Sequence, residues 1–295
     1  MDDPPILHAA PLAYENPNFI RSPDGRILRI LAEYQEPLAR FRRERIQDTV
    51  VFFGSARFAS RSDAETALQV LEKPASRTPA PPEEQAKVRR ARAAVEMARY
   101  YEDARQLASM LAQWSMRLPF KRHRFVVTTG GGPGIMEAAN RGAYEAGAKT
   151  IGLNIRLPYE QFPNRYITPS LNFEFHYFFM RKYWFAYLAK ALVIFPGGFG
   201  TMDELFEILT LAQTEKLAKK ILVIIYGRDY WERVLNFKSL VDAGTIAARD
   251  LDLYRVVDSP DEAFRILRDG LTKFHLQGMH PTQEQKAPGI AKTRG

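Results

Sequence analysis

The part of this chain that most restricts its fold runs from Ala191 to Thr210, with the sequence ALVIFPGGFGTMDELFEILT. An apolar run, Leu192 to Phe195, is followed by a glycine-rich loop and then by apolar residues at helical spacing. This order predicts a strand, a glycine loop and a helix. The backbone amides of such a loop and the positive end of the helix dipole favour an anion, and phosphate is the natural one.

We place Glu204 in the first turn of this helix, close enough for its carboxylate to act on whatever the phosphate anchors. An alternative needs no ligand, because Thr201 and Glu204 also have the spacing of a capping box. This stretch alone does not decide between the two interpretations. The candidate phosphate- or substrate-binding residues in it are Gly197, Gly198, Gly200, Thr201, Asp203 and Thr210.

A second glycine loop follows the apolar run from Phe125 to Thr129. It precedes a helix predicted from Ile135 to Ala146, and Pro133 suits the first turn of that helix because its missing N–H costs nothing there. Neither loop has the spacing G-x-G-x-x-G or G-x-x-x-x-G-K-[ST], which weakens an assignment to ordinary dinucleotide or ATP binding. Its candidate anion-binding residues are Gly130, Gly131, Gly132 and Gly134, to which we add Gly54 and Ser55 after the first buried strand.

Strands and helices alternate along the chain, which predicts an α/β fold: a Rossmann-like, doubly wound parallel sheet flanked by helices. Glycine loops that follow parallel strands lie at the carboxyl edge of the sheet, where open α/β folds bind ligands. We predict strands at 49–55, 125–129, 150–155, 171–175, 192–195, 221–226 and 254–257. We predict helices at 62–71, 84–118, 135–146, 230–241 and 260–274, and an aromatic-rich helix through Met180 that ends near Lys190.

One main nucleotide-binding domain is predicted over residues 49–275, preceded by an arm at 1–48. Prolines interrupt the first part of the arm, after which Ile27, Leu28, Leu31 and Leu38 form a helical stripe that must pack on something. Residues 73–84 contain prolines that preclude a helix, so we expect an exposed connector within the domain. We expect the polar tail, 276–295, to be disordered.

Composition excludes several classes of chemistry. The chain has no cysteine, so it has neither disulfides nor thiolate metal sites nor a cysteine nucleophile. Its five histidines show no metal-ligand spacing, and we expect no metal ion. The chain begins without a basic and apolar leader, and its apolar runs are shorter than the ~18 residues of a membrane span. We therefore expect a soluble cytoplasmic protein.

The net charge is +8, spread over several basic stretches. Nucleic-acid recognition normally also shows a known reading module, and we find none. We interpret these stretches as solvated basic faces and expect no nucleic-acid partner, although an anionic small substrate also fits the charge. The stretches are 40–45, 87–92, 117–124, 216–220 and the tail.

Three motifs together resemble the Lonely Guy (LOG) family: Gly130-Gly-Gly-Pro-Gly-Ile-Met136, Met180-Arg-Lys182 and Pro196-Gly-Gly-Phe-Gly-Thr-Met-Asp-Glu204. The resemblance covers about Thr49 to Val257, and its P-G-G-x-G-T-x-x-E motif is highly specific. The family comprises nucleoside 5′-monophosphate phosphoribohydrolases, often catalogued under the older label "lysine decarboxylase-like". The arm and the proline-rich connector lie outside the short members, so the chain resembles the longer bacterial type.

The resemblance implies that Glu204 and Arg181 are catalytic, with Lys182 beside them at the phosphate. It implies release of a free base and ribose 5-phosphate from AMP or from a cytokinin riboside 5′-monophosphate, without a cofactor. Plant members have Met-His-Glu-Arg-Lys where this chain has Phe178-Phe-Met-Arg-Lys182. The acidic neighbour of the Arg-Lys pair is missing here, which leaves the base specificity open.

Two other functions remain from the sequence. A non-catalytic nucleotide or cofactor carrier would use the same loops, although binding alone does not require Glu204. A pyridoxal-phosphate decarboxylase would need a Schiff-base lysine, and no sequence pattern in this chain indicates that a lysine has that role. Finally, the aromatic helix and the arm present more apolar surface than one α/β layer covers, which predicts a homodimer or higher homo-oligomer.

Overall fold

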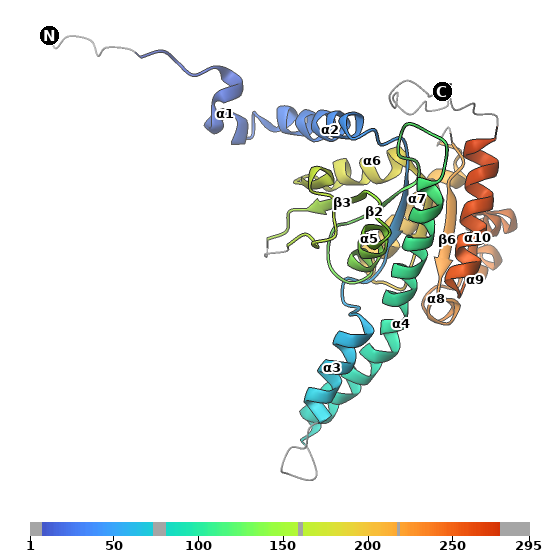
Figure 1. Ribbon diagram of the computed structural model, residues 1–295. Helices are drawn as coiled ribbons and strands as arrows, with labels where there is room; N and C mark the ends of the chain where they lie inside the picture. Colours follow the sequence, from blue (N-terminus) through green and yellow to red (C-terminus); the bar gives the residue numbers. More distant parts are fainter. Residues whose placement is uncertain (1–7, 73–80, 159–161, 217–218, 278–295) are drawn as a thin grey trace.

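The computed structural model describes residues 8–72, 81–158, 162–216 and 219–277 (Figure 1). Its centre is one parallel sheet of seven strands in the order β4-β3-β2-β1-β5-β6-β7. The strand order reverses beside β1, so the predicted Rossmann-like, doubly wound sheet is confirmed. The strands are β1 Thr49–Phe53, β2 Val126–Thr129, β3 Thr150–Ile155, β4 Asn172–Phe175, β5 Ala189–Ile194, β6 Leu222–Tyr226 and β7 Tyr254–Val257.

Helices cover both faces of the sheet, and alternate side chains of each strand supply the two cores. Val50 and Phe52 of β1 belong to the core that includes α4, α5 and α10, whereas Val51 and Phe53 belong to the core that includes α2, α6 and α7. The helices are α1 Pro17–Arg21, α2 Arg26–Arg43, α3 Arg61–Glu72, α4 Pro82–Met116, α5 Ile135–Glu145, α6 Phe178–Leu188, α7 Phe199–Gln213, α8 Arg228–Val234, α9 Phe237–Asp242 and α10 Pro260–Leu271. Among the described helices, none is long and apolar enough to cross a membrane.

The central strand β1 lies between β2 and β5, and the chain leaves the sheet in opposite directions on its two sides. A crevice forms at the carboxyl edge of a parallel sheet at such a switch point. The turn at Gly54 follows β1, and the two glycine loops follow its two neighbours, β2 and β5. The topology therefore brings three loops together that are far apart in the sequence.

Most boundaries differ from the sequence prediction by a few residues, and three of the differences have a structural cause. The helix expected at 230–241 is two helices, because Leu235 and Asn236 leave the helical conformation and the Asn236 side chain caps a new helix by accepting from the Ser239 amide. The connector is shorter than predicted, because Pro82 begins α4 at a position where its missing N–H costs nothing. Residues 73–80 lie outside the described part. Helix α6 ends at Leu188, and β5 follows without a loop.

Helix α2 packs on the body through one side, which includes Ile30, Tyr34, Leu38 and Phe41. Leu38 and Phe41 are buried beside Trp184 of α6, and Phe41 and Trp184 have ring centroids 5.3 Å apart. Ile27 and Leu31 are 70% and 51% exposed, so the prediction that the whole stripe packs is wrong for the single chain. The physical reason is that the start of α2 reaches beyond the body together with α1 (Figure 1). The predicted disorder of the tail concerns residues that, after Gln277, lie outside the described part.

Candidate active site

Two backbone hydrogen bonds join the three loops at the carboxyl edge of the sheet. The Ser55 amide donates to the Pro196 carbonyl over 2.9 Å, and the Ile135 amide donates to the Ser55 carbonyl over 3.0 Å. The turn after β1 is thus fastened on one side to the loop after β5 and on the other to the start of α5. Gly54, Ser55 and both glycine loops, all predicted from the sequence, are thus neighbours at this edge of the sheet.

The loop after β5 ends at Gly198, which is the N-cap of α7. The amides of Thr201 and Met202 both donate to the Gly198 carbonyl, each over 3.0 Å. The preceding amides of the first turn, those of Phe199 and Gly200, have no carbonyl within the helix to bind. Among the residues that the structure describes, no N-cap side chain caps this turn. The turn therefore offers amide donors and a positive dipole end, as phosphate binding needs.

The three glycines of this loop have different reasons for lacking a side chain. A Cβ added at Gly197 would lie 2.1 Å from Oγ1 of Thr201, so close packing excludes any larger residue there. A Cβ added at Gly198 or Gly200 would have no atom of the described residues within 4 Å. These two positions border open space, which leaves room for a ligand against their backbone.

The capping-box interpretation of Thr201 and Glu204 is wrong. Helix α7 starts at Phe199, so Thr201 already lies within it, and Gly198 takes the N-cap position without a side-chain cap. Glu204 consequently lies in the second turn and not the first, since a turn takes 3.6 residues. Similarly, Pro133 precedes the helix that it was predicted to begin, because Gly134 is the N-cap of α5.

The loop after β2 approaches its neighbours closely on all sides. Gly131 and Gly134 have φ angles of +77° and +70°, which favour glycine. A Cβ at Gly134 would lie 2.3 Å from the Ser55 carbonyl oxygen. At Gly130 it would lie 2.5 Å from Nη2 of Arg181. The second glycine loop therefore touches both the turn after β1 and the predicted catalytic arginine.

Arg181 is held firmly beside this loop. Its Nε donates to the Leu153 carbonyl at 2.7 Å, and its guanidinium carbon lies 5.0 Å from the centroid of the Phe185 ring. Burial lowers the pKa of Arg181, and the charge of Glu204 opposes that shift. With Nε bound to the protein, the two terminal nitrogens remain for a ligand.

Glu204 is buried, with 6% of its surface exposed. Burial raises the pKa of its carboxyl from 4.5 to about 7, while the positive charges of Lys182 and Arg181 pull that pKa down. Its Oε1 lies 3.6 Å from Nζ of Lys182. A carboxyl that titrates near neutrality beside two cations is the arrangement that acid–base catalysis requires.

Lys182 is bound by carboxylates rather than left free for a phosphate. Its Nζ lies 2.8 Å from Oδ2 of Asp203 and 2.7 Å from Oε2 of Glu207. Burial lowers the pKa of Lys182, but the hydrogen bonds that Lys182 donates to these two carboxylates raise it by more. Sequence reasoning missed Glu207, although its i, i+3 spacing from Glu204 places both carboxylates on one side of α7.

Thr210 is the one predicted site residue that the structure does not bring to the loops. Its hydroxyl donates to the Phe206 carbonyl over 2.7 Å, within its own helix. It lines a small apolar pocket of about 100 Å³ together with Leu209 and Phe237. A threonine six residues beyond Glu204 lies about 9 Å further along the helix axis, at 1.5 Å per residue.

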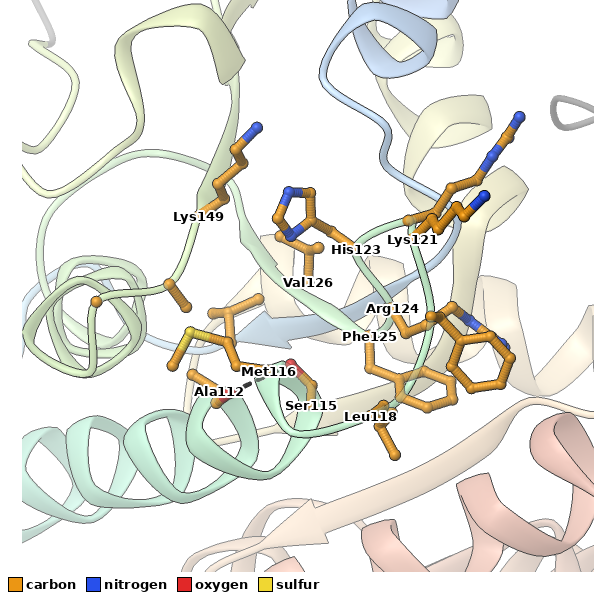
Figure 2. A pocket seen from close by; sticks show the side chains of 15 residues that line it. Ala112, Ser115, Met116, Leu118, Lys121, His123, Arg124, Phe125, Val126 and Lys149 are labelled. Carbon is orange, nitrogen blue, oxygen red and sulfur yellow. Dashed lines mark hydrogen bonds between the residues drawn. The ribbon is translucent and has the colours of Figure 1, made fainter. Parts of the chain in front are cut away.

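A larger pocket, of about 410 Å³, lies at the opposite edge of the sheet, where β2 and β3 begin (Figure 2). Lys121, His123 and Lys149 line it, and Lys149 forms an ion pair with Glu44 at 2.8 Å. Burial and the charge of Lys149 lower the pKa of His123. The basic stretch 117–124 thus gathers on the far side of the sheet from the glycine loops and does not take part in the candidate site.

Among the residues that the structure describes, no three His, Cys, Asp or Glu side chains are arranged to hold a metal ion.

The parallel sheet and its helical layers make the chain a Rossmann-like α/β protein. Residues 136–267 match the protein family described as "Possible lysine decarboxylase". This match contains the Arg-Lys pair and the P-G-G-x-G-T-x-x-E motif, and it supports the resemblance to a LOG-like protein that the motifs predicted. No curated protein is significantly similar to it in sequence.

Similar solved structures include the X-ray structure of TM1055, a structural genomics target, which is 18% identical. The alignment covers 75% of this chain and 99% of that chain, with a TM-score of 0.41. A second is the Moco carrier protein from Chlamydomonas reinhardtii, 20% identical, with 77% and 99% covered and a TM-score of 0.42. Likeness at this level concerns the fold and says nothing about substrate or activity.

Proposed function

We propose that the protein hydrolyses the N-glycosidic bond of nucleoside 5′-monophosphates to give the free base and ribose 5-phosphate. The observation that carries the proposal is the buried Glu204 carboxyl, which lies on the helix whose N-terminus forms an anion cradle and has Arg181 and Lys182 nearby. The loops supply the phosphate site, and Glu204 supplies the chemistry one helical turn away. The LOG-like sequence supports the same assignment.

In the proposed reaction, the 5′-phosphate binds the free amides at Phe199 and Gly200 and fixes the ribose. The bond between C1′ and the base nitrogen breaks through an oxocarbenium-like state, and its electron pair leaves with the base. Ionised Glu204 stabilises the positive charge at C1′ and takes a proton from the attacking water. Arg181 donates a hydrogen bond to the phosphate or to the departing base, where negative charge develops. The base nitrogen then takes up a proton from solvent, and Glu204 releases to solvent the proton that it took from the water.

A non-catalytic carrier is the alternative, and Glu204 argues against it. A buried carboxyl costs free energy to ionise and, once ionised, repels a bound phosphate. A protein that only bound phosphate would be better served by an amide or an apolar side chain at this position. A role in chemistry explains why a carboxyl is tolerated there.

The proposal is tested by incubating the purified protein with a panel of nucleoside 5′-monophosphates and separating the products by chromatography. We expect stoichiometric free base and ribose 5-phosphate from at least one member of the panel. The matching nucleosides should remain intact, because without the phosphate the sugar is not anchored. Tight binding of a nucleotide without release of base would establish the carrier instead, and equal turnover of AMP and adenosine would contradict the phosphate site.

A further inference from the structure

Both glycine loops are held from one side by a side chain that binds their carbonyl oxygens. The Tyr230 hydroxyl, on α8, donates to the Gly197 carbonyl over 2.9 Å. The Asn164 side-chain amide donates to the carbonyls of Gly131 and Gly132, each over 3.1 Å. Neither residue belongs to a glycine motif, and both come from segments distant in sequence from the loop that they hold.

Asn164 is itself fixed within a buried polar network. Its side-chain amide also donates to Oδ1 of Asn140 over 2.9 Å, and the same oxygen accepts from the Thr129 hydroxyl over 2.6 Å. The Thr129 hydroxyl in turn accepts from the Gly131 amide over 2.9 Å. Asn140 and Thr129 are fully buried, so water does not compete with these bonds.

Peptide planarity gives these hydrogen bonds a consequence for the amides. In a trans peptide the carbonyl of one residue and the N–H of the next point in opposite directions. Because Tyr230 holds the Gly197 carbonyl, the Gly198 N–H is turned away from Tyr230. Because Asn164 holds the Gly131 carbonyl, the Gly132 N–H is turned away from Asn164.

Gly198, whose amide is turned away from Tyr230, lies beside open space. A Cβ added at Gly198 would have no atom of the described residues within 4 Å, whereas one at Gly197 would collide with Thr201. Gly197 is therefore packed closely against Thr201, whereas Gly198 borders open space. A donor held in this way is preorganised for an anion and needs no rearrangement when the anion binds.

We propose that Tyr230 and Asn164 are positioning residues of the phosphate site. Each holds one glycine loop by its carbonyl oxygens and keeps the next amide, that of Gly198 or Gly132, turned toward a phosphate monoester. The inference rests on the proposed function for the identity of the anion. It goes beyond that function in assigning two residues that touch the loops and not the ligand.

The test replaces Tyr230 with Phe, which removes one oxygen and keeps the ring. Tyr226→Phe is the matched control, because the Tyr226 hydroxyl donates to Asp103 and to the Asp258 carbonyl and touches neither glycine loop. Binding of ribose 5-phosphate and of inorganic phosphate is measured by titration calorimetry, and the Tm of each variant is recorded. We expect Tyr230→Phe to weaken both ligands about tenfold, the usual worth of one hydrogen bond to a charged group.

Tyr226→Phe should lower the Tm to a similar extent and leave both affinities unchanged. Asn164→Asp, which keeps the shape but turns a carboxylate oxygen toward two carbonyls, should weaken binding further; if it does not fold, Tyr230→Phe still decides. Equal affinities for wild type and Tyr230→Phe, or equal losses in Tyr230→Phe and Tyr226→Phe, would overturn the inference. So would a wild-type protein that binds neither ligand.

These results are separable from the proposed function. A wild-type protein that binds ribose 5-phosphate but cleaves no nucleotide would contradict the hydrolase, while the comparison of affinities would still support or overturn the role of Tyr230. If the protein cleaves a nucleotide and Tyr230→Phe does not change the phosphate affinity, the hydrolase is supported and the role of Tyr230 is overturned.

Discussion

Glu204 is subject to opposing effects whose balance sets its charge. Burial raises the pKa of its carboxyl from 4.5 to about 7, and the cations Lys182 and Arg181 offset only part of that rise. A rise of this size corresponds to about 3 kcal/mol of free energy against the ionised form, at 1.36 kcal/mol per pKa unit. The carboxyl at this position therefore lowers the stability of the folded protein at neutral pH.

This balance predicts a pH-dependent stability difference. Between pH 4.5 and about 7 the folded state keeps the Glu204 proton while the unfolded state releases it, so the contribution of Glu204 to the free energy of unfolding falls as pH rises. Glu204→Gln has no such proton and should gain stability relative to wild type, by up to about 3 kcal/mol at pH 8 compared with pH 4.5. Urea denaturation of both proteins at the two pH values measures this difference; a difference independent of pH would show that Glu204 has an ordinary pKa.

The same substitution should remove most of the activity. Glutamine keeps the shape but cannot take a proton from water, so we expect a rate lower by roughly two to four orders of magnitude, with substrate binding retained. In the wild type, kcat/KM should rise with pH through about 7, and Glu204→Gln should lack this limb. Glu207→Gln, on the same side of α7, is the control and should have a much smaller effect. A folded Glu204→Gln protein that retains most of its rate would refute the mechanism.

Arg181→Ala should impair binding and catalysis together. The guanidinium lies beside Gly130 and is held by the Leu153 carbonyl, so its removal takes a fixed positive charge from the phosphate and from the departing base. We expect kcat/KM to fall by more than either kcat or binding alone. Measuring Kd for ribose 5-phosphate beside the steady-state constants separates the two losses, and a variant with unchanged Kd and unchanged kcat would remove Arg181 from the site.

At the scale of elements, the glycine loops are shaped by contact with neighbours rather than by flexibility. Gly131 illustrates this, because its φ is +77° and an added Cβ would lie 2.2 Å from Oδ1 of Asn154. Asn154 cannot easily move aside, since its amide nitrogen donates to Oδ1 of Asn172 and to the Phe173 carbonyl. A larger residue at this position must therefore displace the loop itself.

We predict that Gly131→Ala abolishes nucleotide binding, whereas Gly147→Ala does not. Gly147 has a similar φ, +82°, but an added Cβ there meets no atom of the described residues within 4 Å. Both variants should lose about 1–2 kcal/mol of stability from the left-handed backbone, so the pair isolates the effect of the collision. Comparing their Tm values and nucleotide affinities tests this, and equal affinities would mean that the loop after β2 does not contact the ligand.

At the scale of the whole molecule, α2 and α6 leave large apolar side chains uncovered. Ile27, Leu28 and Leu31 on α2 are exposed, as are Phe178 and Phe179 at the start of α6. Contiguous apolar surface of this kind usually marks an interface, and closed two-fold dimers are the commonest solution. The homodimer expected from the sequence remains a prediction, and we propose this surface as its interface.

Sedimentation at micromolar concentration should show a dimer for the wild type. The double variant Ile27→Asp and Leu31→Asp should sediment as a monomer, because burying two carboxylates in an apolar interface is prohibitive. Val70→Asp makes the same kind of change at an exposed apolar residue of α3, 63% exposed, and serves as the control. A monomeric wild type would contradict the assignment.

Local patterns were enough to predict most of the elements. The apolar runs that became β1, β2 and β3, and the helices that became α3 and α5, appear in the sequence because a buried strand and an amphipathic helix have different periods. The motifs likewise identified Glu204, Arg181 and the glycine loops. These features depend on residues that are close together in the sequence or on a known motif, so they can be predicted without the tertiary structure.

Only the tertiary structure decided what surrounds those residues. Helix α7 starts at Phe199 because the Gly198 carbonyl accepts the first helical hydrogen bonds. Glu204 therefore lies in the second turn and not in the first. The raised pKa of Glu204 and the binding of Lys182 by Glu207 depend on packing between α6 and α7. No local sequence pattern predicts the hydrogen bonds that Asn164 and Tyr230 donate to the loop carbonyls. Burial, charge balance and long-range hydrogen bonds join residues that the chain separates, so no single stretch of sequence contains them.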